Sequence, residues 1–192
     1  MAVTSNLTKG QRAKREKLIT VAQWGTGNDK KRQFLGVRTE DSSIDLNPDI
    51  QTSTDILGHT YTDVEKTEPQ QTMDPSYIVG GSYLHDYLTE AFLANDIDKY
   101  NGAFDIYIIS AYLNDGTPTT SDGKYYTVKH TGCSIFPTSV GGSNYVSMPI
   151  EIHYSNNITK GTVDALKPGF TFTYTDGSGS SATDTWTDPD ED

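Results

Sequence analysis

The segment FDIYIISAY, which runs from residue 104 to residue 112, decides the fold class of this chain. Side chains of a β-strand point alternately to its two faces. One face of this segment therefore carries Phe104, Ile106 and Ile108, and the other carries Tyr107, Ile109 and Ala111. A strand that is apolar on both faces is typical of a central strand, because neither face can be left to solvent.

One helix is predicted upstream of this strand, from Ser82 to Ala94. Its apolar residues recur at steps of three and four and form one stripe: Leu84, Tyr87, Leu88, Ala91 and Phe92. His85, Asp86, Thr89 and Glu90 are expected on the opposite, polar side. A single amphipathic helix cannot bury its own stripe, so we expect it to pack against a sheet.

Shorter strand patterns surround these two elements. They cover residues 17–24, 33–38, 60–66, 68–73, 124–130, 134–139, 145–154, 160–164 and 170–174. The sequence thus predicts a mainly β fold, a β-sandwich or partly closed barrel of about seven to ten strands with one flanking helix.

Three regions are predicted along the chain. Residues 1–17 form a basic N-terminal arm, residues 18–175 a β domain, and residues 176–192 a flexible, acidic tail rich in Gly, Ser and Asp. Within the domain, residues 39–59 lack clear periodicity and are expected to form a long functional loop. Its sparse apolar residues either anchor it to its own domain or dock onto another subunit: Ile44, Leu46, Ile50, Ile56 and Leu57.

Charge is divided unevenly. The first 38 residues hold nine Lys or Arg against two acids, whereas the remainder holds six bases against 24 acids, a net charge of −18. Five residues of the basic arm are candidate contacts: Lys9, Arg12, Lys14, Arg15 and Lys17. They can pair with acidic surface on another copy, bind nucleic acid, or remain solvated.

Templates for catalytic and metal sites do not fit. Counting from Asp96, a calcium loop would need Gly and Glu where Asn101 and Tyr107 stand. Cys133 cannot form an internal disulfide because it is the one cysteine, and a nucleophilic pair with His130 is disfavoured by strand geometry. We therefore expect no enzyme, cofactor, metal or small-molecule substrate. No signal peptide or membrane span is expected either, so assembly in a reducing cytoplasm is predicted.

The order of elements resembles that of the major tail (tail tube) proteins of long-tailed phages and prophages. The similarity covers roughly residues 10–175 and includes the segments 46-LNPD-49 and 68-EPQQTMDP-75. It implies subunits that join sheet edges into hexameric rings, which stack into a tube carrying the genome. Implied partners are further copies, tape measure and tail terminator proteins, and DNA that passes without tight binding, in a virion assembled in the host cytoplasm. The loop 39–59 and both terminal segments would contact neighbouring subunits.

Other classes remain open at this point. A ring-forming baseplate or head–tail completion protein would have a similar β-rich composition. A carbohydrate-binding β-sandwich would use Trp24, Trp186 and surface tyrosines as stacking platforms. An enzyme whose site is assembled from distant residues is the least favoured class.

Overall fold

The computed structural model describes residues 4–37, 39–114, 124–166 and 169–185. Within these residues the chain forms thirteen strands, one α-helix and three short 3-10 helices. The strands are β1 (Thr4–Ser5), β2 (Leu18–Trp24), β3 (Lys31–Phe34), β4 (Thr39–Asp45), β5 (Pro48–Thr54), β6 (Thr60–Thr67), β7 (Gln70–Ser76), β8 (Phe104–Asn114), β9 (Tyr125–Pro137), β10 (Ile150–His153), β11 (Ile158–Val163), β12 (Thr171–Thr175) and β13 (Ser181–Thr185). The helices are η1 (Arg15–Lys17), η2 (Gly27–Asp29), α1 (Tyr83–Ala94) and η3 (Ile97–Lys99).

Strand β8 occupies the predicted central position. It pairs antiparallel with β2 on one side and with β9 on the other, while β1 pairs with its far end. Its two faces enter different cores. Phe104 and Ile106 belong to a larger core that includes the helix, whereas Tyr107 and Ile109 belong to a smaller core on the opposite face. The prediction of a strand that is buried on both sides is confirmed.

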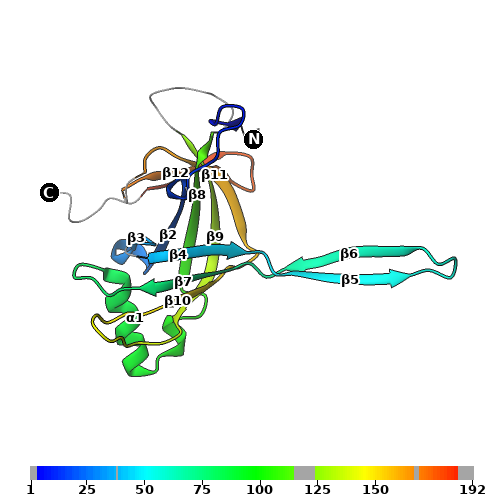
Figure 1. Ribbon diagram of the computed structural model, residues 1–192. Coiled ribbons are helices and arrows are strands. Elements are labelled where there is room, and N and C mark those ends of the chain that lie inside the picture. Colours follow the sequence, from blue (N-terminus) through cyan, green and yellow to red (C-terminus); the bar gives the residue numbers. More distant parts are fainter. Residues whose placement is uncertain (1–3, 38, 115–123, 167–168, 186–192) are drawn as a thin grey trace.

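The long strand β9 joins two parts of the sheet. Its first half lies between β8 and β11, and its last residues pair with β10, which continues the sheet to β7 and β4. The sequence predicted two separate strands here, but one strand continues past an irregularity in its pairing with β8 at Gly132, whose φ is +78°. The sheet curls into a partly closed barrel with α1 beside it, as the sequence predicted (Figure 1).

Helix α1 is confirmed over nearly its predicted length, with Leu84, Leu88 and Ala91 buried. His85 was expected on the polar side and is instead buried. Its two ring nitrogens are hydrogen-bonded to the hydroxyls of Ser76 (3.0 Å) and Ser82 (2.7 Å), which satisfy a polar ring among apolar neighbours. The side of the helix that carries His85 is therefore buried as well as the aliphatic stripe, and it is tied to Ser76 at the end of β7.

The predicted loop over residues 39–59 is wrong. Residues of this stretch form β4, which pairs with β7, and β5, which pairs with β6 in a long hairpin. The strands predicted over residues 60–66 and 68–73 correspond to β6, which turns outward with β5, and to β7, which stays in the barrel. Both strands of the hairpin face solvent and are rich in Thr and Ser. They therefore lack the apolar alternation that marks a half-buried strand.

The predicted flexible tail is wrong for residues 176–185. A turn follows Asp176, whose carboxylate accepts hydrogen bonds from the amides of Ser178 and Ser180, each at 2.9 Å. Strand β13 then pairs with β12. Residues 186–192, including Trp186 and the final acidic run, lie outside the described residues.

Candidate assembly surface

The hairpin of β5 and β6 extends away from the barrel as a separate arm (Figure 1). Its strands pair from Pro48↔Thr67 to Thr54↔Thr60, and their residues are almost all exposed. An isolated two-stranded hairpin is at best marginally stable in water, because it buries little apolar surface. The arm is therefore a surface that a partner could complete.

Apolar side chains are placed along this arm in a definite order. Ile50 and Val64 lie directly opposite each other across the two strands, and both are more than half exposed. Ile56 and Leu57 form the tip, where Ile56 is fully exposed and Leu57 is 76% exposed. Single exposed apolar residues are common on proteins, but four on one uncovered arm favour a contact role.

The tip is held rigid by Asp55. Its carboxylate accepts hydrogen bonds from the amides of Leu57 (2.8 Å) and His59 (2.9 Å) and from the hydroxyl of Tyr61 (3.1 Å). The hydrogen bond from the His59 amide is the main cause of a pKa of Asp55 that lies below its usual value. The turn therefore presents Ile56 and Leu57 in one geometry, which lowers the entropy cost of binding.

The predicted apolar contact residues separate into two groups. Leu46, Ile50, Ile56 and Leu57 are exposed along the hairpin or at its base. Ile44 instead lies on β4 and packs against the larger core, because its position in the β4–β7 ladder turns it inward. Tyr61 and Val64 belong to the same exposed arm and were missed, although the strand predicted over residues 60–66 contained both.

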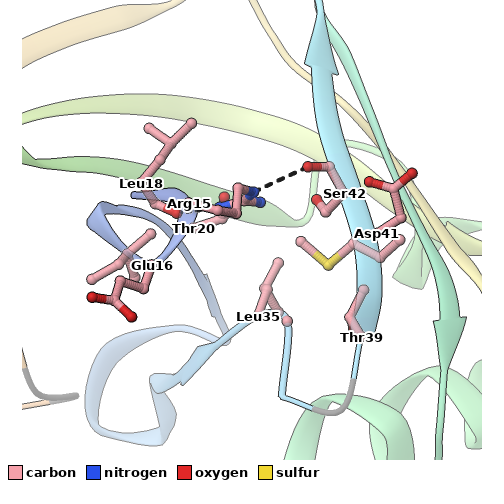
Figure 2. A pocket seen from close by; sticks show the side chains of 11 residues that line it. Arg15, Glu16, Leu18, Thr20, Leu35, Thr39, Asp41 and Ser42 are labelled. Carbon is pink, nitrogen blue, oxygen red and sulfur yellow. Dashed lines mark hydrogen bonds between the residues drawn. The ribbon is translucent and has the colours of Figure 1, made fainter. Parts of the chain in front are cut away.

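A pocket of about 380 Å³ lies at the seam of the barrel, where the edge strand β4 faces β2 and the segment after β3 (Figure 2). Leu18, Ile19, Leu35 and Met73 supply the apolar part of its lining. Arg15 crosses the seam: its Nε donates to the carbonyl of Ser42 on β4 at 3.2 Å, and its Nη1 donates to the carbonyl of Leu18 at 2.5 Å. We call this feature the seam pocket.

The other candidates of the basic arm remain on the surface. Lys9, Arg12, Lys14 and Lys17 are exposed, and Lys14 forms an exposed ion pair with Glu16 at 3.6 Å. Such exposed pairs contribute little stability. Arg15 is exposed too, but it also lines the seam pocket, whereas the four other basic side chains form a positive surface on the segment leading to it.

Strands β3, β4 and β13 each pair on one side only within the described residues. Open strand edges present unpaired backbone donors and acceptors, which invite pairing with another chain. These edges and the hairpin are the parts of the described surface that look least complete in a single copy.

A buried polar cluster fixes the C-terminal strand. The Arg32 side chain has no exposed area, and its guanidinium lies 3.4 Å from the carboxylate of Asp184 on β13. Asp184 also accepts hydrogen bonds from Tyr107 (2.6 Å) and Lys129 (3.0 Å). Burial alone would raise the pKa of Asp184, but these hydrogen bonds and the two positive charges lower it overall. The cluster ties β13 to β3, β8 and β9.

Trp24 and Cys133, which were considered for carbohydrate binding and for nucleophilic chemistry, are buried in the structure. Trp24 is buried against Tyr87 and Phe104, so it cannot serve as a carbohydrate platform. Cys133 is also buried, which raises the pKa of its thiol.

Among the described residues, no three His, Cys, Asp or Glu side chains gather as a metal-binding group. In the same part of the chain, no helix has the length and apolar character needed to cross a membrane.

No protein-family model matches the chain, and no curated protein matches it. Seven chains of solved structures match it, including three with 14–17% identity. The sheath/tube terminator of an extracellular contractile injection system, PVC, has 16% identity and a TM-score of 0.44, with 80% of this chain and 99% of that chain covered. The PVC sheath–tube complex has 17% identity and a TM-score of 0.43, with coverages of 80% and 94%. The tube terminating cap of the anti-feeding prophage has 14% identity and a TM-score of 0.42, with coverages of 82% and 95%. These structures are not described as major tail proteins of long-tailed phages, so that family stays a prediction.

Proposed function

We propose that this chain is a structural protein of a phage tail that assembles with copies of itself into stacked rings, and that the rings form a tube through which DNA passes. By the resemblance in the sequence, each ring would contain six subunits, and the tube would meet tape measure and tail terminator proteins. It would assemble in the host cytoplasm and remain in the virion.

The observation that carries this proposal is the uncovered hairpin. The arm presents four exposed apolar side chains at its tip and along its strands, and none of the described residues covers them. Burial of such side chains contributes roughly 25 cal/mol per Å² of apolar surface, so a partner that covers the arm gains stability. A repeated subunit supplies that partner at every copy.

The open strand edges support the same conclusion. Edges of β3, β4 and β13 would be aggregation hazards in a monomer, but they become ordered contacts when identical subunits close into a ring. The proposal thus assigns the surfaces that a single copy leaves incomplete to contacts between copies.

Charge suits a conduit for DNA. The chain from residue 39 onward carries a net charge of −18. Each phosphate that a protein neutralises adds affinity through counterion release, so an acidic bore would let DNA slide without binding. Weak retention is the property that a delivery tube requires.

Removal of the hairpin tests the proposal. The amide of Glu68 donates to the carbonyls of Leu46 (3.1 Å) and Asn47 (3.3 Å), so the hairpin base is already closed. Residues 48–67 can therefore be replaced by two glycines with little disturbance of the barrel. We expect a folded monomer with an unchanged thermal transition that no longer assembles. Tubes formed by this variant would overturn the role of the hairpin.

A further inference from the structure

We infer that the seam pocket is the receptor for the hairpin tip of a second copy, so that Ile56 and Leu57 of one subunit enter the pocket between β2 and β4 of the next. This inference rests on the proposed self-assembly and adds the acceptor site, which neither the sequence nor the comparisons assign.

The donor cannot reach its own receptor. The hairpin projects away from β2 and β3, and about eight residues of strand at roughly 3.3 Å each separate the tip from the barrel (Figure 1). Its turn is already ordered by Asp55. The partner that receives the tip must therefore be another molecule.

The acceptor has room for the tip and offers apolar contacts beside polar side chains that include Arg15, Glu16 and Asp41. Ile19, Leu35 and Met73 offer an apolar floor, and the pocket volume of about 380 Å³ corresponds to about a dozen waters at about 30 Å³ each. Two aliphatic side chains fit within such a volume. Apolar side chains that replace these waters gain the free energy of burial on both surfaces.

One hydroxyl in the lining of the seam pocket lacks a hydrogen-bond partner. Among the described residues, Thr39 Oγ1 is the buried side-chain oxygen or nitrogen for which no hydrogen-bond partner is found. Thr39 lines the seam pocket (Figure 2). Buried polar groups without a partner are rare because they cost about 1–3 kcal/mol.

Charges on the two surfaces are complementary beyond the tip. The hairpin, residues 48–67, has four acids and one Lys, for a net charge of −3. Residues 9–17, which lead to the pocket, have five bases and one acid, for a net charge of +4. Glu16 at the pocket is paired with Lys14, so the basic character dominates this approach.

The geometry of this contact produces a series. Donor and acceptor are different surfaces of one subunit, so the contact is head-to-tail and leaves a free tip and a free pocket at the ends. Within one ring such a contact closes on itself, whereas between stacked rings its repetition builds an open-ended series along the tube.

Cysteine cross-linking tests the inference in the full chain. The double variant Leu57→Cys/Leu35→Cys places one thiol at the tip and one in the pocket, while the native Cys133 is buried and silent. Oxidation of assembled protein should give a covalent ladder well beyond dimers on a denaturing gel. Each single variant should give dimers at most, because one reactive thiol per chain cannot form a ladder.

A matched control separates specific contact from random collision. Leu57→Cys/Leu93→Cys carries its second thiol on α1, where Leu93 is 78% exposed outside the pocket, and it should give no ladder. Thr39→Cys in place of Leu35→Cys repeats the test at a second pocket position if the first variant folds poorly. Assemblies visible by electron microscopy without a ladder, or with equal ladders in both double variants, would overturn the receptor assignment and leave self-assembly standing. Protein that stays monomeric would overturn both.

Discussion

Replacement of Asp184 by Asn should destabilise the chain strongly, because it removes a charge from a buried cluster. Arg32 has a fully buried side chain, and its neutral partners would then be the side chain of Gln23, the carbonyl of Phe170 and the hydroxyl of Tyr107. Loss of one partner from a buried ion pair costs about 3–5 kcal/mol, since the remaining charge stays desolvated. Lys129 would still form its ion pair with Asp105 at 2.9 Å. We therefore expect a loss of unfolding free energy at the lower end of this range, about 3 kcal/mol.

Urea unfolding followed by circular dichroism measures this effect. Asp63→Asn is the matched control, because Asp63 lies on the exposed hairpin and its replacement should change the unfolding free energy by less than about 0.5 kcal/mol. A cost below about 1 kcal/mol for Asp184→Asn would refute the reasoning, and with it the claim that β13 is fixed by charge.

The stability difference between the native chain and Asp184→Asn should depend on pH. The pKa of Asp184 in the folded chain is below its unfolded value of about 3.9. Its stabilisation is therefore present above about pH 4 and is lost as pH falls through the folded pKa. The stability difference between the native chain and Asp184→Asn should shrink below about pH 4. A difference that stays constant in acid would show that the loss comes from packing and not from charge.

Two substitutions and one change of pH test other parts of the structure. Thr39→Val should raise the unfolding free energy of the monomer by about 1 kcal/mol, measured by urea titration, because it removes an unpaired buried hydroxyl. Gly161→Ala should cost about 1–3 kcal/mol in the same assay, since its Cβ would lie 2.6 Å from the Phe172 ring and 2.3 Å from a backbone oxygen. Burial lowers the pKa values of His85 and His130, so the thermal midpoint should fall as pH drops below about 6.5, where the unfolded chain binds more protons; an unchanged midpoint at pH 5 would contradict this.

The larger core could be predicted from the sequence because its signals are local. Alternation through Phe104 and Ile106 and the helical spacing of Leu84 and Leu88 each depend on neighbours a few residues away. Such patterns reflect burial directly, so the central strand, the helix and the fold class emerged from them.

The assembly surface was harder to predict because its strands are not buried. Hairpin residues such as Thr52 and Thr62 pair through the backbone and face solvent, so they carry no apolar alternation. Strand β13 looked like a tail because its composition is polar, and the pairing of Asp184 with Arg32 depends on residues distant in sequence. Arg15 was chosen for its charge, but its place at the seam pocket depends on how the barrel curls.

The helix required a partner that sequence alone did not reveal. Ser82 stands at the expected start but makes no side-chain capping bond. Instead Gln33 on β3 accepts a hydrogen bond from the amide of Leu84 at 2.9 Å and donates to Ser82 Oγ at 2.8 Å. A cap supplied from another strand satisfies the helix end equally well, and it ties α1 to the barrel.

Sedimentation velocity of the purified full chain near neutral pH, with negative-stain microscopy of the same sample, tests self-assembly most directly. The account predicts species that grow with protein concentration and appear as open-ended tubes. Closed single rings would instead favour the baseplate or head–tail completion class. A strictly monomeric chain at high concentration would contradict the account.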